Sequence, residues 1–275
     1  MIPELFHLGP VSISPFGPAM VAAFLAAWAQ LRWGLAHYDL LDEEDASAIL
    51  LAAGIGGILG AKVYYALLYG DWRLLLDRSG LVWYGGLIGG ALAVLWTVRR
   101  RGLPMVRVVD IATPAVAVGY GIGRIGCFLV GDDYGIATQL PWGVKFPYGL
   151  PYPTTAANMR GFRGEVDPSL PADALVAVHP TQLYEVAAAV VMLLVCRRLL
   201  VRRVPPGVVA VVGFSILAFE RFLVEFVRAK DDRFFGSLSV AQVISLVILV
   251  LMVVAWTRID RSPRSHPPES RPAAP

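Results

Sequence analysis

The sequence predicts an all-α polytopic membrane protein with seven transmembrane helices. Of its 275 residues, 56% are hydrophobic and only 16% are charged, and the mean hydropathy is +0.61. Soluble domains are closer to half apolar and a quarter charged, so this composition excludes an ordinary globular enzyme. A spanning helix needs about 20 apolar residues. Seven stretches meet that need: residues 15–36, 46–69, 81–99, 106–129, 182–201, 207–227 and 238–257.

Arginine clusters predict the orientation of these helices. Basic residues are enriched in cytoplasmic connections. Here they gather after the third stretch as Arg99-Arg100-Arg101 and after the fifth as the pairs Arg197-Arg198 and Arg202-Arg203. We therefore expect the N-terminus outside and the C-terminus in the cytoplasm. We interpret the clustered arginines as topology signals without a chemical role.

Two segments are expected to lie outside the membrane. Residues 130–181 are rich in proline, glycine and aromatic residues, including Trp142 and Tyr148, which suit the headgroup layer. We expect turns and short strands on the outer face. Residues 261–275 lack an apolar face, which predicts a disordered cytoplasmic tail. Residues 1–260 would then form one seven-helix domain.

Other sequence features argue against several kinds of site. Cys127 and Cys196 lie near opposite ends of different predicted helices, which argues against a disulfide. The chain has no metal-type spacing of Cys and His, so we expect no metal and no cofactor. No basic residue precedes Arg32, so we expect no cleavable signal peptide. We expect no nucleic acid partner.

Residues 119–135, G-Y-G-I-G-R-I-G-C-F-L-V-G-D-D-Y-G, form the most unusual stretch. Its glycines suit close packing of membrane helices. Arg124 is a charge at membrane depth, where charges are costly and usually functional. From these residues alone, Arg124 either reaches a lipid headgroup or serves a site. A dinucleotide-binding loop is excluded, because no strand precedes the glycines.

Polar residues from five predicted helices reach one depth near the outer surface. They are Lys62, Tyr65, Tyr84, Arg124, His179, Gln182, Tyr184, Arg221, Glu225 and Arg228. The last three share a helical face through their i, i+4, i+7 spacing. Arg124 and Arg221 in one cavity favour an anion, because guanidinium groups match phosphate. The commonest anion at that depth is a phospholipid headgroup.

Structural interpretations of these residues stay open as well. Glu225 is most simply the ion-pair partner of Arg221. Gln182 and Tyr184 would tie helices together, and His179 would be a helix-start residue. A transporter is disfavoured, because neither polar residues along a whole pathway through the helices nor an inverted repeat is evident.

Four motifs occur in order along the chain. They are Y-G-G-L-I-G-G at 84–90, G-R-I-G-C-F-L-V-G-D-D-Y-G at 123–135, H-P-T-Q-L-Y-E at 179–185 and R-F-L-V-E-F-V-R at 221–228. With L-G-P-V-S-I-S-P-F-G at 8–17, they resemble the prolipoprotein diacylglyceryl transferase family over residues 8–257. This resemblance implies a bacterial inner-membrane enzyme with its active site toward the outer leaflet.

The resemblance also implies a reaction. The family moves diacylglycerol from phosphatidylglycerol to the lipobox cysteine thiol of an exported prolipoprotein. A thioether forms and glycerol 1-phosphate leaves, without metal or nucleotide. The thiol needs activation, because a free cysteine with a pKa of about 8.5 is mostly protonated at pH 7. The leaving phosphate needs cations.

Site residues follow from matching these motifs. Arg124 and Arg221 match the family's functional arginines. The substrate-binding set is expected to comprise Arg124, Arg221, Arg228, Gly85, Gly86, Gly135, Gln182 and Tyr184. Glu225 is expected to be a structural ion-pair partner, and the signature acid is Asp132 or Asp133.

Three positions depart from the family pattern: Tyr84 replaces a frequent His, Cys127 a frequent Asn and Leu217 a frequent Tyr. We expect Tyr84 to occupy the position of the base. His179 and direct electrostatic activation of the thiolate are the alternatives. These departures also leave open a non-catalytic paralogue that binds phospholipid or lipoprotein.

Overall fold

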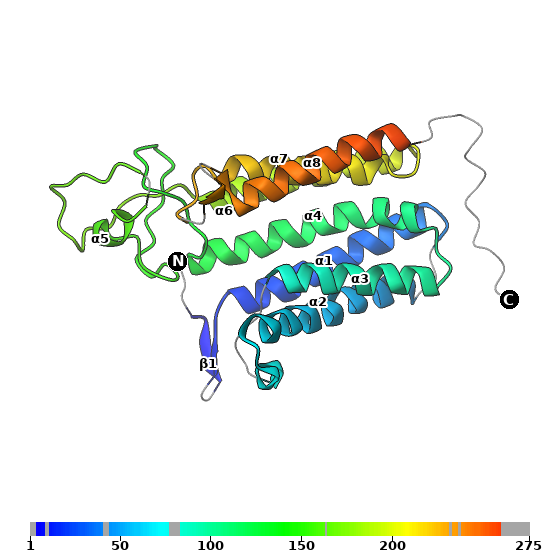
Figure 1. Ribbon diagram of the computed structural model, residues 1–275, viewed down its shortest axis with the longest axis horizontal. Helices are drawn as coiled ribbons and strands as arrows, with labels where there is room; N and C mark the ends of the chain where they lie inside the picture. The colour runs from blue at the N-terminus through cyan, green and yellow to red at the C-terminus, as the bar shows by residue number, and fades with distance from the viewer. Residues whose placement is uncertain are drawn as a thin grey trace. The chain divides into compact units, whose positions relative to one another are not determined.

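The computed structural model describes residues 4–8, 11–40, 44–76, 83–162, 164–230, 233–235 and 238–259. Long helices dominate these ranges (Figure 1). They are α1 (Phe16–His37), α2 (Asp45–Tyr69), α3 (Trp83–Arg100), α4 (Met105–Val130), α6 (Thr181–Val201), α7 (Val208–Val224) and α8 (Val240–Arg258). Each coincides with one predicted apolar stretch, and the all-α class is confirmed. The predicted disordered tail, residues 261–275, lies outside the described residues.

Short elements complete the described chain. Strands β1 (Phe6–Leu8) and β2 (Val11–Ile13) form an antiparallel hairpin, as do β3 (Arg233–Phe235) and β4 (Leu238–Ser239). A 3-10 helix, η1 (Trp72–Leu76), follows α2, and a single turn, α5 (Ala156–Met159), lies within the long connection.

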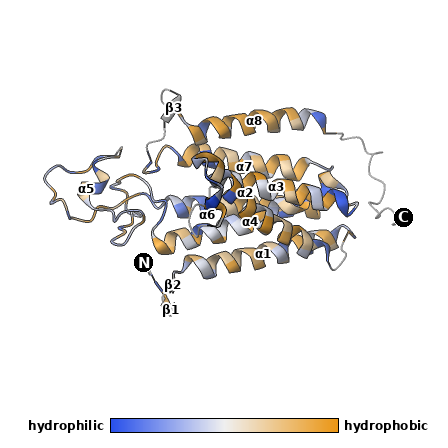
Figure 2. Ribbon diagram, turned by 60° about the horizontal axis from the view of Figure 1, so that its bottom comes forward, coloured by the Kyte–Doolittle hydropathy of each residue, from blue (hydrophilic) through white to orange (hydrophobic). Residues whose placement is uncertain are grey.

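Within the described residues, four helices are long and apolar enough to cross a membrane: α1, α2, α4 and α8. The remaining long helices are shorter or carry more charge. α7 has 17 residues, α3 ends on Arg99-Arg100, and α6 contains Glu185 and Arg197-Arg198. Hydrophobic residues run along the helices in Figure 2, and several on α2, such as Leu51, are about 60% exposed. A polytopic membrane protein accounts for this surface, whereas the number of seven spans stays a prediction.

Two compact units make up the chain. One comprises residues 1–26 and 113–259, and the other comprises residues 27–112 and 260–275. Both α1 and α4 therefore contribute residues to each unit. The single domain predicted over residues 1–260 stays a prediction.

In the unit of residues 27–112, α2 and α3 pack directly through glycines (Figure 1). A Cβ atom on Gly60 would overlap the carbonyl oxygen of Gly85, and one on Gly56 would lie 2.7 Å from that of Gly89. Such close backbone contact is typical of small residues between membrane helices. Beyond α3, Arg101 Nη1 donates a hydrogen bond of 2.7 Å to the buried Asp45 carboxylate at the start of α2.

In the other unit, α7 packs against both α6 and α8 (Figure 1). Gly213 of α7 allows α4 and α6 to approach α7 closely, because a Cβ there would meet Thr113 of α4 and, at 2.9 Å, the Cys196 sulfur of α6. α8 begins with a capping box in which Ser239 and Gln242 satisfy each other's backbone N–H groups. This packing brings α4, α6 and α7 together where their polar residues lie.

The connection between α4 and α6 folds around its own small core. Tyr134, Phe146, Met159 and Val178 form a buried cluster there. The expected turns are present in this segment, together with α5, whereas the expected short strands are reduced to isolated β-bridges in the described residues. The cluster holds in place the chain that follows α4 and the chain that precedes α6.

Candidate active site

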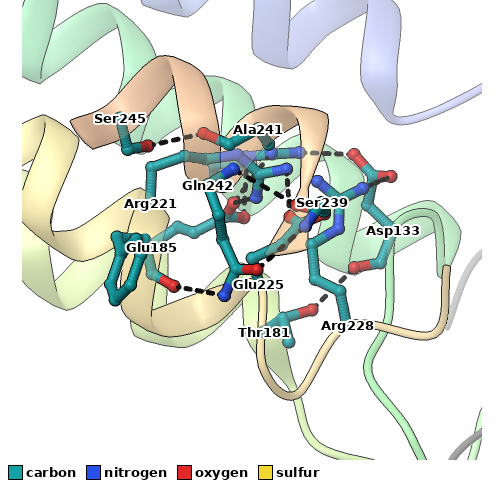
Figure 3. A network of polar contacts seen from close by, with 12 residues as sticks. Asp133, Thr181, Glu185, Arg221, Glu225, Arg228, Ser239, Ala241, Gln242 and Ser245 are labelled. Atoms are coloured by element: carbon teal, nitrogen blue, oxygen red, sulfur yellow. Dashed lines mark hydrogen bonds and ion pairs between the residues drawn. The ribbon is translucent and has the colours of Figure 1, made fainter. Parts of the chain in front are cut away.

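Three arginines share acidic partners in the unit that contains α6 and α7, and Figure 3 shows two of them, Arg221 and Arg228, among these acids. Arg124 comes from α4, Arg221 from the end of α7, and Arg228 from the turn beyond α7. Their side chains are only 15%, 24% and 10% exposed. Arginines this buried require partners, because isolated buried charges are very costly.

Glu185 of α6 is the central partner of these arginines. Its side chain is 1% exposed, its Oε2 lies 2.8 Å from Arg124 Nε, and its Oε1 accepts a 2.9 Å hydrogen bond from Arg124 Nη2. The same Oε1 lies 3.7 Å from Arg221 Nη1. One carboxylate therefore links α4, α6 and α7. Arg221 also pairs with Glu225 at 2.5 Å, in the arrangement expected from the sequence.

Asp133 joins the other side of the arginine cluster. Its carboxylate accepts a 2.7 Å hydrogen bond from Arg124 Nη1 and pairs with Arg228. Burial alone would raise the pKa of the Asp133 carboxyl, but Arg228 and Arg124 outweigh burial and hold that pKa below its usual value. Its φ of 62° lies in the left-handed region, which aspartate tolerates better than most residues.

The start of α6 holds this turn in place. Thr181 Oγ1 donates to the Asp133 carbonyl and Gln182 Nε2 donates to the Asp132 carbonyl, both at 2.6 Å. Thr181 and Gln182 are completely buried. Gln182 thus positions the backbone that carries the two aspartates, and its contact with lipid stays a prediction.

Asp132 faces different surroundings from its neighbour. It lines a pocket of about 450 Å³ whose other residues are Glu4, Ser14, Phe16, Val130, Tyr148 and Leu150. Burial, and then the adjacent charge of Asp133, raise the pKa of the Asp132 carboxyl above its usual value. The two adjacent acids therefore have pKa values shifted in opposite directions, with Asp133 as the paired acid and Asp132 as the one open to a cavity.

Gly135 lies where three segments meet. Its N–H donates to the His179 carbonyl at 2.9 Å. A Cβ at this position would lie 2.7 Å from His179 Cβ and would also overlap the carbonyl oxygen of Val227. Only glycine fits here without displacing backbone on both sides. This packing requirement is independent of any lipid contact by Gly135.

His179 and Tyr184 form a separate polar pair. His179 Nδ1 lies 3.1 Å from the Tyr184 hydroxyl, which also accepts a 2.8 Å hydrogen bond from Trp142 Nε1. Burial lowers the pKa of His179, so its ring is neutral at pH 7. None of the described polar contacts of these residues involves the three arginines.

The predicted residues at the start of α3 belong to the unit of residues 27–112. Tyr84 is part of α3, but its side chain lies outside the described residues. Gly85 packs against Gly60 and Tyr64 of α2, and a Cβ atom added to Gly86 would lie 3.3 Å from the Gly57 carbonyl oxygen. The structure gives both glycines a packing role, while their contact with lipid stays a prediction.

Sequence reasoning paired Glu225 with Arg221 but gave no role to Glu185 and did not single out Asp133. Glu185 was visible as a carboxylate inside a predicted apolar helix, which is itself a signal of function. The sequence alone does not show which of the adjacent residues Asp132 and Asp133 pairs with the arginines, because that depends on the geometry of the turn. Cys127, one of the three departures, has its sulfur 3.7 Å from Arg124 Nη1. In the described part of the chain the two cysteines are buried and form no disulfide, and no group of His, Cys, Asp or Glu there is arranged to hold a metal ion.

Comparison with known proteins decides the family. Residues 3–258 match the sequence profile described as prolipoprotein diacylglyceryl transferase. The chain belongs to the prolipoprotein diacylglyceryl transferase family. The family predicted from the four motifs is therefore confirmed.

Named bacterial relatives match over nearly their whole length. A phosphatidylglycerol–prolipoprotein diacylglyceryl transferase of Xylella fastidiosa (strain M12) is 35% identical, with 96% of this chain and 95% of the relative aligned. Proteins of the same name from Vibrio vulnificus (strain YJ016) and Aeromonas hydrophila are 30% and 29% identical. Their alignments cover 92% and 94% of this chain, and 90% and 91% of the relatives.

Proposed function

We propose that this protein transfers the diacylglyceryl group of phosphatidylglycerol to the lipobox cysteine thiol of exported prolipoproteins. The products are a thioether and glycerol 1-phosphate. The observation that carries this proposal is the buried cluster of Arg124, Arg221 and Arg228 around Glu185, in a chain of the transferase family. Three guanidinium groups at the ends of apolar helices suit an anionic lipid headgroup.

The arginines would hold the phosphate and stabilise the charge that grows on it. Arg221 Nη1 is buried and has no hydrogen-bond partner among the described residues, so it has a donor to offer. Arg124 is oriented by Glu185 and Asp133, which leaves its guanidinium fixed before the lipid arrives. Preorganised donors of this kind usually contribute the largest share of catalysis. The substrate-binding residues proposed besides these two are Arg228, Gly85, Gly86, Gly135, Gln182 and Tyr184.

The thiol must lose its proton during the reaction. Tyr84 is the proposed base, since it occupies the family's base position, and it would act as a tyrosinate near cations. His179 is the second candidate, because burial lowers its pKa and keeps the ring neutral and able to accept a proton at pH 7. Direct electrostatic activation of the thiolate is the third route.

The proposed setting is the bacterial inner membrane. Seven spans, an outer N-terminus and a cytoplasmic C-terminus would place the arginine cluster toward the outer leaflet. The distribution of arginine between connections supports this orientation, and an exported acceptor protein requires a site on that side. Labelling of single introduced cysteines in cells tests this orientation. A cysteine placed within residues 165–175 and one placed at Glu44 should react with reagents from opposite sides of the membrane.

The alternative function is a non-catalytic paralogue that binds phospholipid or lipoprotein. Tyr84, Cys127 and Leu217 favour it, because each departs from the family pattern. The deciding experiment incubates the purified protein in phosphatidylglycerol vesicles with a lipobox peptide and follows the peptide mass. Gain of one diacylglyceryl group, absent with a Cys→Ser peptide, supports the transferase. Peptide binding without any mass gain supports the paralogue.

Complementation of a bacterium depleted of its transferase provides the test in cells. The expected result is restored growth and lipidation of a test prolipoprotein. A folded, membrane-inserted protein that restores neither would contradict the transferase assignment.

A further inference from the structure

Glu220 of α7 is a buried acid that the proposed mechanism does not use. It is 7% exposed, and neither of its carboxylate oxygens has a hydrogen-bond partner among the described residues. Buried carboxylates in proteins are normally paired or hydrogen-bonded, because an isolated one is costly. A buried carboxylate without a hydrogen-bond partner beside a proposed active site indicates that it is either protonated or paired with a group of the substrate.

Charged and titratable groups approach Glu220 from each neighbouring polar segment. Those close enough to interact with it electrostatically are Tyr120 and Arg124 from α4, Glu185 from α6, Arg221 from α7 and Arg228 beyond α7. α8 also packs on α7, but its only titratable side chain is Arg258 at its far end. Glu220 therefore lies at the edge of the arginine cluster itself.

The charges of this cluster are already balanced without Glu220. Arg124, Arg221 and Arg228 pair with three carboxylates, those of Asp133, Glu185 and Glu225. Glu220 is a fourth carboxylate, and none of the three arginines forms an ion pair with it in the described structure. Asp133, Glu185 and Glu225 each have an arginine within ion-pair distance, whereas Glu220 has none among the described residues.

The transfer reaction adds negative charge at the same place. Phosphatidylglycerol brings one negative charge as a phosphodiester. Cleavage leaves a phosphate monoester, whose second ionisation has a pKa of about 6 and which can therefore carry a second charge. Because Arg124, Arg221 and Arg228 already have carboxylate partners, a proton delivered to the leaving phosphate would relieve a charge that no unpaired arginine of this cluster balances.

We propose that Glu220 holds a proton when phosphatidylglycerol is bound and donates it to the leaving phosphate. In this step the thiolate sulfur forms a bond to the glyceryl carbon. The bond between that carbon and the phosphate oxygen breaks, and its electron pair stays on the oxygen. The Glu220 proton neutralises one charge of the phosphate. The proton that the thiol gave up reloads Glu220 after product release, so atoms and charge balance over one turnover.

This inference rests on the proposed transferase function and deepens it. It makes Glu220 a catalytic residue that acts on the leaving group, separate from the base that acts on the thiol. General acids of this kind contribute roughly 10²–10⁴ in rate.

The experiment compares Glu220→Gln with the wild-type protein on two lipids. One is phosphatidylglycerol, and the other is an analogue with sulfate in place of phosphate, whose leaving group is too weakly basic to need a proton. Glu220→Gln should transfer from phosphatidylglycerol ~10²-fold more slowly, but from the sulfate analogue at close to the wild-type rate. Glu44→Gln, at a carboxylate that is 84% exposed, is the matched control and should react normally with both lipids.

A second measurement follows single-turnover rate against pH. Loss of the Glu220 proton should oppose the rise in rate that the thiol's base gives as pH increases. The ratio of the wild-type rate to the Glu220→Gln rate on phosphatidylglycerol should therefore fall as pH rises. Glu220→Asp, which keeps a titratable proton, covers the case in which the glutamine variant does not fold.

The outcomes separate this inference from the transferase proposal. Equal slowing of Glu220→Gln on both lipids would mean a structural role, and full activity on phosphatidylglycerol would mean no role; either result overturns the inference while leaving the transferase intact. Absence of transfer by the folded wild-type protein overturns both proposals.

Discussion

Glu185 of α6 contacts Arg124 of α4 through both of its carboxylate oxygens, at 2.8 Å from Nε and 2.9 Å from Nη2. The Nη2 contact is a hydrogen bond and the Nε contact is an ion pair, and together they hold the guanidinium group beside the carboxylate. Because the same carboxylate lies 3.7 Å from Arg221, it also sets the spacing of the two proposed phosphate-binding arginines. Glu185 is thus a positioning residue for a site on two other helices.

Removing this acid should damage both fold and activity. Glu185→Ala leaves two arginines without their shared partner, and breaking a buried ion pair costs about 3–5 kcal/mol. Glu185→Gln keeps the shape and one acceptor, so we expect a smaller loss of stability but misplaced arginines and slow transfer. Thermal unfolding in detergent measures the loss of stability, and a transfer assay measures the loss of activity. An alanine variant as stable as the wild-type protein would contradict this account.

Replacement of Arg124 or Arg221, even by lysine, should lower the transfer rate. Arg221→Ala and Arg124→Ala should each lower the transfer rate by ~10²–10³. Lysine at either position should rescue poorly, because it lacks the planar fork. Steady-state transfer from phosphatidylglycerol vesicles provides the measurement, with Arg73→Ala, an exposed arginine outside the cluster, as the control. Full turnover by Arg221→Ala would remove the phosphate-binding role.

Glu225 should orient Arg221 without carrying a proton. Its side chain is 3% exposed and lies 2.5 Å from Arg221. We therefore expect Glu225→Gln to keep measurable activity and Glu225→Ala to lose expression or folding. Membrane yield and a pH–rate profile of both variants test this. A folded, inactive Glu225→Gln that has lost one limb of the profile would identify Glu225 as a base.

The pH–rate profile also separates the two candidate bases. Burial lowers the pKa of His179, so a histidine base would already be deprotonated above its ordinary pKa of about 6.5 and the rate would be level by pH 7. A tyrosine base, with an ordinary pKa of about 10, would still gain activity above pH 7.

Under the Tyr84 proposal, Tyr84→Phe loses most activity. Tyr84→His shifts the alkaline rise toward neutral pH, and His179→Ala is mild. A fully active Tyr84→Phe protein would exclude Tyr84 and leave His179 or direct thiolate activation.

Gly135 should tolerate no side chain. Gly135→Ala would force Cβ against His179 and Val227 from two directions, displacing the segment that carries Asp133. We expect faster proteolysis of residues 131–180 and loss of transfer. Gly161→Ala is the matched control, because the nearest atom to its Cβ would be 3.8 Å away. Normal proteolytic resistance in Gly135→Ala would show that the loop adapts.

The sequence was most informative where hydropathy alone decides structure. Seven apolar stretches correspond to seven long helices because length and apolarity depend only on local composition. The i, i+4 spacing of Arg221 and Glu225 likewise predicted the pair that is observed, since neighbours on one helix face are fixed by helix geometry.

Contacts between segments far apart in sequence could not be predicted in this way. The link between Arg124 and Glu185 joins residues 61 positions apart, and the link between Asp133 and Arg228 joins residues 95 apart. Only the packing of α4, α6 and α7 reveals which acid meets which arginine. For the same reason, the sequence does not show that the Glu220 carboxylate lacks a hydrogen-bond partner among the described residues.

The seam between α2 and α3 affects how genetic screens on this protein should be interpreted. A Cβ atom at Gly56, Gly60, Gly85 or Gly89 would overlap backbone atoms of the facing helix, and at Gly56 and Gly85 also the Cβ atom of Ala93 or Tyr64. Because Cβ atoms move only with the backbone, changes of rotamer cannot make room for a larger residue. Random mutagenesis for defects in lipoprotein maturation should therefore recover substitutions at these four positions. Such hits would look like active-site residues by phenotype, although the defect would be the separation of two helices.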